Sequence, residues 1–362
     1  MPPVHQKASI ISRSEAAAMK GVGILLIVVH NLAHTLGVTG YDCNEYNFEQ
    51  AAADALFYWL QHPSTDLPIQ LSTLLGYCGI YIFLFLSAFG LVRKYEQSTS
   101  AMPAPHIFIW KHYKKLFSLM ILGLVAAIAI ASMHFSSQLP LKRYWIAQAL
   151  MISNWFSPPY RHVFPGPYWF LGLMVELYII YRLILYVPPK GASWRRWLLP
   201  IAFAIVCLAP QFYYIADGRT ILFLRYNFFV ASLSFAAGLL VARYGRPIHI
   251  SRRAWAAIFL LTTILFVAMQ KTATLWLLSS LVAAIAIIAS VKMLPATLQK
   301  PLVWTGAISA HLFIVHPVVR LIAFEFKGTI NNHLLLALYL AASLLAATLY
   351  SRLHKKITQK KK

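Results

Sequence analysis

Charged residues, and acidic ones above all, are scarce in this sequence. Only 12% of its 362 residues are charged, with 10 Asp and Glu against 32 Lys and Arg, whereas 59% are hydrophobic. A soluble globular domain carries about 25% charged residues, so this chain has too few polar side chains to cover a globule in water. The scarcity argues against a soluble protein and predicts a chain whose outer surface faces lipid.

Cysteines and nucleic-acid-binding patterns are also sparse. The three cysteines, Cys43, Cys78 and Cys207, form no CxxC pair and no spacing typical of a metal site. We therefore expect no bound metal and no bound cofactor. The net charge of +22 does not indicate a nucleic-acid partner, because the basic residues form short clusters between apolar runs rather than a polar stretch interleaved with aromatics.

Long apolar runs dominate the chain instead. A helix needs about 20 mostly apolar residues to cross the hydrocarbon core, and ten segments approach or exceed that length. The expected spans are 19–39, 69–92, 116–134, 167–187, 197–215, 226–244, 254–270, 272–291, 301–321 and 333–353. They predict an all-α, polytopic transmembrane bundle over 19–353, between an N-terminal segment (1–18) and a basic tail (354–362).

The distribution of Lys and Arg predicts the orientation of the bundle. If the N-terminus is cytoplasmic, most of the 32 basic residues fall in the inner segments, as the positive-inside rule requires. Arg225 and Arg320 are among the few that fall in the outer segments. We therefore expect both termini in the cytoplasm, in a multi-pass protein of the inner or plasma membrane in contact with membrane lipid.

Acidic residues gather in the first outer loop, 40–68. This loop holds half of the carboxylates of the chain, together with several aromatic side chains. Aromatic rings beside carboxylates are typical of a sugar-binding surface, but an interfacial loop with its aromatics at the lipid headgroups has the same composition. The residues concerned are Asp42, Glu45, Glu49, Asp54 and Asp66, with Tyr41, Tyr46, Phe48, Tyr58 and Trp59.

Two histidines of the first span are the leading catalytic candidates. His30 follows Lys20 by ten residues, which places it about 15 Å deep, and His34 lies one turn further on the same face. A neutral imidazole can take a proton from a hydroxyl and return it later, as an acyl transfer from a thioester to an alcohol requires. Packing of the two histidines within the bundle, or a metal held by the pair, are the alternatives.

Glu176 is the one carboxylate expected inside a span. It is about 14 Å from the outer end of 167–187, so it shares the depth of the histidines. An ionisable group at that depth is costly and therefore predicts a functional site. Glu176 could raise the basicity of a histidine or bind an acceptor hydroxyl, or it could serve as a structural partner of Arg182 or of a tyrosine.

Weaker candidates lie in other spans and at the inner surface. For His316, a role in the site and a role in helix packing are equally well supported. Ser87 is more typical of close helix packing. A basic cluster beside the second and third spans could hold the phosphates of coenzyme A, although topology and anionic lipid would account for it equally. The cluster consists of Arg93, Lys94, Lys111, Lys114 and Lys115.

Four segments, in order, resemble the integral-membrane acyltransferase-3 family. They are the first span with Lys20 and its histidines, the stretch Gly79–Gly90 with Ser87, the stretch from Trp169 through Glu176 to Tyr178, and Ser309 through His316 and Pro317. The resemblance covers roughly 15–350. It implies ten helices, acetyl-CoA or another acyl-CoA as the co-substrate, and a sugar hydroxyl of a cell-envelope glycan or lipid-linked glycan as the acceptor.

The resemblance also implies roles for individual residues. The first-span histidine would be the catalytic base, Trp169, Tyr178, His316 and Ser87 would face the substrates, and the basic cluster would bind the donor. The spacing between Lys20 and His30 is one residue shorter than is usual in the family. Either the entry of the first span into the membrane is shifted at Lys20, or His34 is the catalytic base. A transporter or flippase for a lipid-linked sugar or small solute remains the alternative, since it too needs intramembrane His and Glu.

Overall fold

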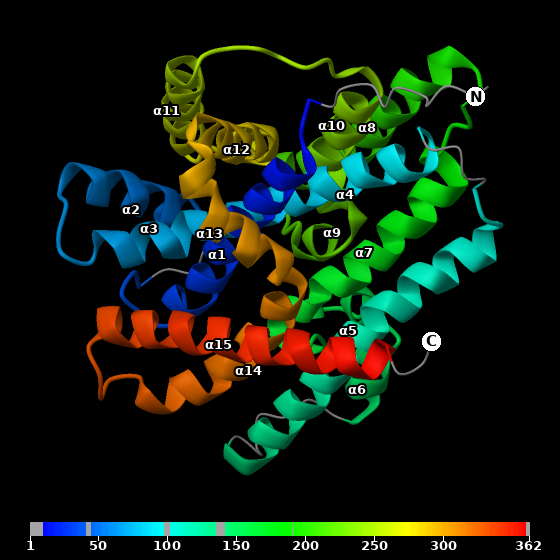
Figure 1. Cartoon of the computed structure of the whole chain (residues 1–362). Coiled ribbons are helices and arrows are strands. Elements are labelled where there is room, and N and C mark those ends of the chain that lie inside the picture. Colours follow the sequence, from blue (N-terminus) through cyan, green and yellow to red (C-terminus); the bar gives the residue numbers. More distant parts are fainter. Residues whose placement is uncertain (1–9, 41–44, 98–101, 135–141, 190, 360–362) are drawn as a thin grey trace.

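The computed structural model describes residues 10–40, 45–97, 102–134, 142–189 and 191–359. Within these ranges every named element is a helix (Figure 1). The helices of the first half are α1 (Arg13–Ala33), α2 (Gln50–Gln61), α3 (Leu67–Leu75), α4 (Gly79–Tyr95), α5 (Pro105–His134), α6 (Lys142–Ala149) and α7 (Trp169–Ile180). Those of the second half are α8 (Ser193–Ala216), α9 (Leu222–Tyr226), α10 (Ser232–Tyr244), α11 (Arg252–Met269), α12 (Ala273–Met293), α13 (Ala296–Ala307), α14 (Ser309–Ala323) and α15 (Asn332–Gln359).

The prediction of an all-helical membrane bundle is confirmed. Nine helices of the described chain are long and apolar enough to cross a membrane, and Phe228–Tyr244 is a shorter apolar helix in the place of the predicted span 226–244. The bounds of several spans differ from the predicted ones, and two differences affect the shape of a helix. The first ends at Ala33 instead of continuing to 39, and the ninth is broken at Ile308, between α13 and α14. The predicted segment 1–18, Cys43 and the tail 354–362 fall wholly or partly outside the described residues.

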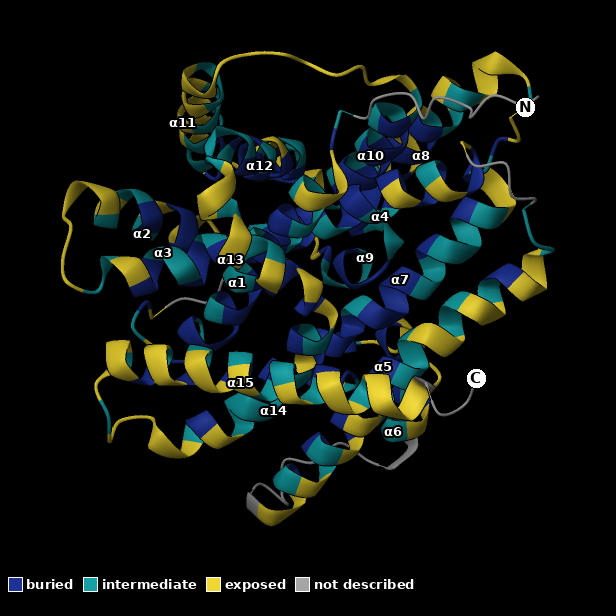
Figure 2. Cartoon of the chain, viewed as in Figure 1, coloured by how far each residue is buried: buried dark blue, intermediate teal, exposed yellow. Residues whose placement is uncertain are grey.

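The outer surface of the bundle is apolar. Figure 2 shows exposed residues along α11 and α15. Large aliphatic side chains form these exposed surfaces, among them Leu260, Leu261 and Ile264 on α11 and Leu345 and Leu349 on α15. A soluble protein rarely exposes apolar patches of this extent, so these faces are suited to lipid.

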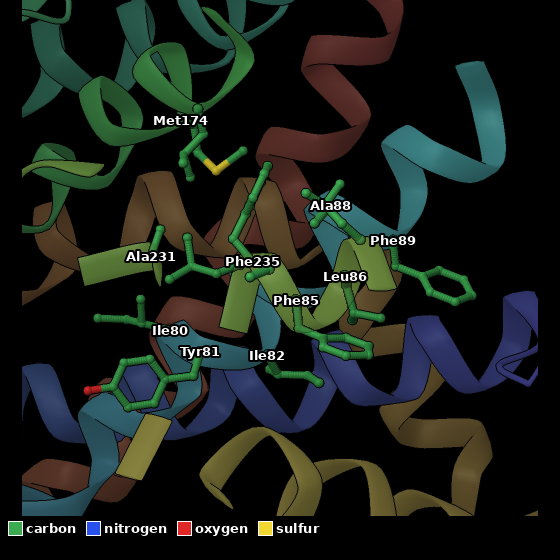
Figure 3. Packing of buried hydrophobic residues seen from close by; sticks show 14 of the residues in the cluster. Ile80, Tyr81, Ile82, Phe85, Leu86, Ala88, Phe89, Met174, Ala231 and Phe235 are labelled. Atoms are coloured by element: carbon green, nitrogen blue, oxygen red, sulfur yellow. The ribbon is translucent and has the colours of Figure 1, made fainter. Parts of the chain in front are cut away.

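The interior is built around α1 and α4. A cluster of buried side chains joins α4 to α7 and α10, with Phe85, Met174 and Phe235 at its centre (Figure 3). Helix α1 starts with a complete capping box of Ser12 and Glu15, which satisfies backbone N–H groups of its first turn. It then crosses α13 so closely that a Cβ on Gly306 would overlap the carbonyl oxygen of Ala17. α1 is thereby held firmly on several sides.

A buried ion pair joins α4 to α10. The guanidinium of Arg243 donates from Nη2 and Nε to the two carboxylate oxygens of Glu96, at 2.7 and 2.9 Å, and both side chains are at most 5% exposed. The hydroxyl of Tyr181 donates to the same carboxylate at 3.1 Å. Arg243 also donates to the carbonyl oxygens of Arg196 and Leu185. This network ties four segments together at the end of the bundle that we expect to be cytoplasmic.

Candidate active site

The last turn of α1 brings the two candidate histidines together. The rings of His30 and His34 stack with centroids 5.2 Å apart and planes inclined by 23°, which agrees with their one-turn spacing. His30 is 2% exposed, and its Nδ1 lies 3.2 Å from the carbonyl oxygen of Ser72. A Cβ on Gly76 would come within 2.6 Å of the Cβ of His30, so a glycine is required where this part of the chain passes the histidine.

The carboxylate beside His30 is Glu45, from the first outer loop. Its Oε2 lies 3.5 Å from Nε2 of His30. The sequence analysis treated Glu45 as one of several loop acids and did not assign it to the histidines. The sequence feature that could have pointed to Glu45 was the concentration of acidic and aromatic residues in 40–68. Two members of that group, Tyr41 and Asp42, lie outside the described residues.

The backbone around Glu45 is fixed by a buried arginine. Nε and Nη2 of Arg225 donate to the carbonyl oxygen of Glu45 at 3.2 and 2.9 Å, and Nη2 also donates to the hydroxyl of Tyr81 at 3.0 Å. The guanidinium lies 4.5 Å from the ring of Trp276 and Arg225 is 3% exposed. A cation counted among the outer segments therefore anchors the loop to the helix bundle.

Aromatic side chains hold the next residue of the loop. Tyr46 stacks on Tyr226, with ring centroids 4.2 Å apart and planes inclined by 17°, and meets Trp169 edge-on at 5.5 Å. Offset and edge-to-face pairs of this kind add to the stability that burial provides. Trp169, which the sequence analysis assigned to the substrate, is thus part of the aromatic wall beside Glu45.

These residues border a cavity of about 430 Å³. We call it the outer cavity, because it lies beside the loop that we expect to face outward. Polar groups from α1, the outer loop and α14 face several aromatic rings across it. The cavity is lined by Asn31, His34, Glu45, Asn47, Glu49 and Arg320, and by Tyr46, Tyr160, Trp169, Phe170, Tyr226 and Phe313, with Ile27, Ile80, Gly166, Pro167 and Leu222. His34 and Glu45 belong to its wall, whereas His30 lies behind them.

Arg320 joins α14 to the end of α1 at this cavity. Its Nη1 donates to the carbonyl oxygen and to Oδ1 of Asn31, both at 3.0 Å, while Nδ2 of Asn31 donates to the carbonyl oxygen of Ile27. A cation at the C-terminal end of a helix is stabilising, so Arg320 fixes the turn that carries the histidines. His316, one turn earlier on α14, is fully buried, and its Nδ1 lies 3.0 Å from the carbonyl oxygen of Leu312.

The described hydrogen bonds of Glu176 are with Asn154 and Phe228 and not with the histidines. Its carboxylate accepts hydrogen bonds from Nδ2 of Asn154 at 2.6 Å and from the backbone N–H of Phe228 at 2.8 Å. It therefore ties α7 to the chain between α9 and α10. The carboxylate is not hydrogen-bonded to Arg182, which instead donates to the carbonyl oxygen of Pro103. A catalytic role for Glu176 stays a prediction.

A second, inner cavity of about 190 Å³ adjoins the first. Its walls are mostly apolar, with Lys20, Ser87, Tyr178 and Ser309 as its polar side chains. Ile27, Phe170 and Phe313 line both cavities. These three side chains are a shared wall between the polar outer cavity and the narrow inner one, and Ile27 lies one turn before His30.

None of the five residues of the predicted donor-binding cluster lines the inner cavity, but His112, on the same helix as three of them, contacts its wall. His112 links the two, because its Nε2 is 3.2 Å from the hydroxyl of Tyr95 and its ring is 4.2 Å from that of Tyr178. The charges of Lys94, Lys111 and Lys115 all act on His112, and that of Lys115 acts on Lys20. Lys114 lies 5.3 Å from the ring of Trp110, and Arg93 donates to Gln97 at 2.8 Å. The sequence analysis did not identify His112.

A comparison with protein families gives a match over most of the chain. A protein-family model described as an acyltransferase domain matches residues 15–352. No curated protein and no solved structure is significantly similar to the chain. The family match covers almost the whole helical bundle and decides for the acyltransferase prediction over the transporter alternative.

Proposed function

We propose, since this chain belongs to the acyltransferase 3 family, that it is a membrane O-acyltransferase that uses acyl-CoA to acylate a sugar hydroxyl of a cell envelope. The observation that carries this proposal is the pair of adjoining cavities, the larger one with several charged and polar side chains and the smaller one mostly apolar, beside the stacked histidines. A transfer between two substrates needs two binding sites that meet at the reacting groups. The shared wall of Ile27, Phe170 and Phe313 is that meeting point.

The inner cavity suits the thioester end of acyl-CoA. Apolar walls accommodate the acyl group and its arm, whereas Lys20 and the basic cluster supply charge-assisted hydrogen bonds to the phosphates. Among the described residues no carboxylate pairs with Lys20, so its charge is available to an anionic ligand. In this proposal Arg93, Lys94, Lys111, Lys114 and Lys115 attract the donor, and Ser87 and Tyr178 line the path of the thioester.

The outer cavity suits a sugar. Tyr160 and Phe170 are aromatic residues of its wall that can contact the apolar side of a pyranose, and Asn47 and Glu49 are polar residues that can contact its hydroxyl groups. Pockets that combine apolar walls with a few placed polar groups are the usual design of small-molecule sites. We therefore infer a sugar or lipid-linked glycan as the acyl acceptor.

The histidines supply the proton transfers. As the acceptor oxygen attacks the thioester carbonyl, the C–O bond forms, the C–S bond breaks and the hydroxyl proton passes to the site formed by the two histidines and Glu45. The coenzyme A thiolate then takes a proton from this site, so that an ester and a free thiol leave. Neither histidine changes its net protonation over one turnover.

Replacing Lys20 tests the donor side of the proposal. We expect Lys20→Ala to raise the KM for acetyl-CoA about 10- to 100-fold, the range that loss of a charge-assisted hydrogen bond produces, with a smaller change in kcat. Release of free coenzyme A by the purified protein in detergent gives both constants. Lys300→Ala is the matched control, because Lys300 is exposed on α13. An unchanged KM in the Lys20 variant would remove Lys20 from the donor site.

Filling the shared wall tests whether the two cavities work as one site. Ile27 is 4% exposed and lines both, so Ile27→Trp should block their junction and lower coenzyme A release at least about 100-fold. Overpacking costs about 1–3 kcal/mol, so a thermal unfolding curve in detergent is needed to confirm that the variant is folded. Wild-type turnover in a folded Ile27→Trp protein would contradict transfer at this junction.

A further inference from the structure

Glu45 and His30 are arranged so that they share one proton. Nδ1 of His30 faces the carbonyl oxygen of Ser72, which only accepts hydrogen bonds, so Nδ1 carries a hydrogen. Nε2 then directs its lone pair toward Oε2 of Glu45, 3.5 Å away. A lone pair and a carboxylate oxygen repel each other unless a proton lies between them. A proton that reaches the pair is therefore held between these two atoms.

Glu45 is the member of the pair that a substrate meets first. Its side chain is 13% exposed, against 3% for that of His30. Glu45 lines the outer cavity, where the acceptor hydroxyl binds in the proposed function, and His30 lies behind that wall. A hydroxyl in the cavity thus reaches the carboxylate directly, whereas His30 is not among the residues that line the cavity.

The surroundings of Glu45 fix its position through its backbone. Both hydrogen bonds from Arg225 go to the backbone carbonyl oxygen of Glu45. Arg225 is itself held by Tyr81 and by the ring of Trp276. These buried contacts hold the backbone of Glu45 in place, and its carboxylate extends to the cavity and to His30.

We propose that Glu45 is a catalytic residue, the group that takes the proton of the acceptor hydroxyl while His30 holds the proton destined for the leaving thiolate. This inference rests on the proposed function. As the acceptor oxygen forms its bond to the acyl carbon, its proton moves to Glu45. The C–S bond breaks, the stored proton of the pair passes to the thiolate sulfur, and the pair again holds one proton.

The test compares two nucleophiles in the purified, full-length protein with acetyl-CoA as the donor. Water needs a base to attack a thioester, whereas hydroxylamine, a neutral and stronger nucleophile, depends on one far less. We expect Glu45→Gln to lower acetyl-CoA hydrolysis at least about 100-fold and to recover most of the wild-type rate with hydroxylamine. Glu45→Asp should retain part of the hydrolysis, because it keeps the carboxylate.

The controls separate the possible failures. Asp54→Asn removes an exposed acid of α2 outside the cavity and should behave as wild type. Equal hydrolysis by Glu45→Gln and wild type would overturn the catalytic role, and so would a loss that hydroxylamine and Glu45→Asp leave unrelieved, which indicates a structural role. If the wild-type protein consumes acetyl-CoA with neither nucleophile, the proposed function itself fails, and the assignment of Glu45 fails with it.

Discussion

Replacement of His30 by alanine should lower acyl transfer about 100- to 10,000-fold, the range that general acid–base catalysis contributes. The reason is that His30 holds the proton for the leaving thiolate and also holds the side chain of Glu45 in position. The loss should appear in kcat, since His30 lies behind the cavity wall and does not itself line the outer cavity. Coenzyme A release at saturating acetyl-CoA measures it.

His34→Ala separates the roles of the two histidines. His34 stacks on His30 and lines the outer cavity, so its loss removes a neighbour of the base and part of the acceptor site. We expect a smaller fall in kcat than for His30→Ala. If His34→Ala abolished turnover and His30→Ala did not, the base would be His34, and the pairing of His30 with Glu45 would have no catalytic meaning.

Breaking the buried ion pair of Glu96 and Arg243 should have the largest effect on stability. Glu96→Gln leaves a buried guanidinium without its countercharge, and removing one partner of such a pair costs about 3–5 kcal/mol. The hydroxyl of Tyr181, which donates to the same carboxylate, would keep only a weaker amide acceptor. Thermal unfolding in detergent, followed by tryptophan fluorescence, should show a clearly lower midpoint.

An exposed ion pair provides the matched control for this prediction. Asp217 and Arg219 lie 2.6 Å apart, with side chains 44% and 60% exposed, and surface pairs contribute at most about 1 kcal/mol. Asp217→Asn should therefore leave the midpoint almost unchanged. Similar midpoints for Glu96→Gln and Asp217→Asn would show that the Glu96 network does not hold the bundle together.

The helices could be predicted because lipid imposes a simple requirement on sequence. A spanning segment needs a long apolar run, and runs such as 69–92 and 272–291 have few alternatives. The break at Ile308 was not predictable from hydropathy, since the residues on both sides of it are as apolar as an unbroken span. Helix α1 ends early because the chain turns after Ala33, within a stretch that is still mostly apolar.

The site was predicted only in part, because depth in the membrane does not fix position within its plane. Glu176 shares the expected depth of His30, yet its described contacts are with Asn154 and Phe228. The acid that reaches His30 is Glu45, from a loop that the search for polar groups inside spans did not cover. Arg225 and Arg320 were counted as outer charges, although tertiary packing buries Arg225 against Trp276 and joins Arg320 to α1.

Local spacing was the reliable guide where it applied. His30 and His34 stack because residues four apart on a helix lie on one face. On α5, His112 contacts Tyr178 of the inner cavity, whereas the binding of a donor by the basic residues beside it stays a prediction. Contacts between distant segments, such as Arg225 with Glu45, depend on the packing of several helices and leave no pattern in a single sequence.

Transfer of an acyl group to an envelope glycan is the central claim, and mass spectrometry of envelope glycans tests it most directly. Cells that produce the wild-type chain should carry an acyl mark on a glycan that cells producing the His30→Ala chain lack, at equal amounts of protein in the membrane. Identical sets of acyl marks in the two strains would contradict the account.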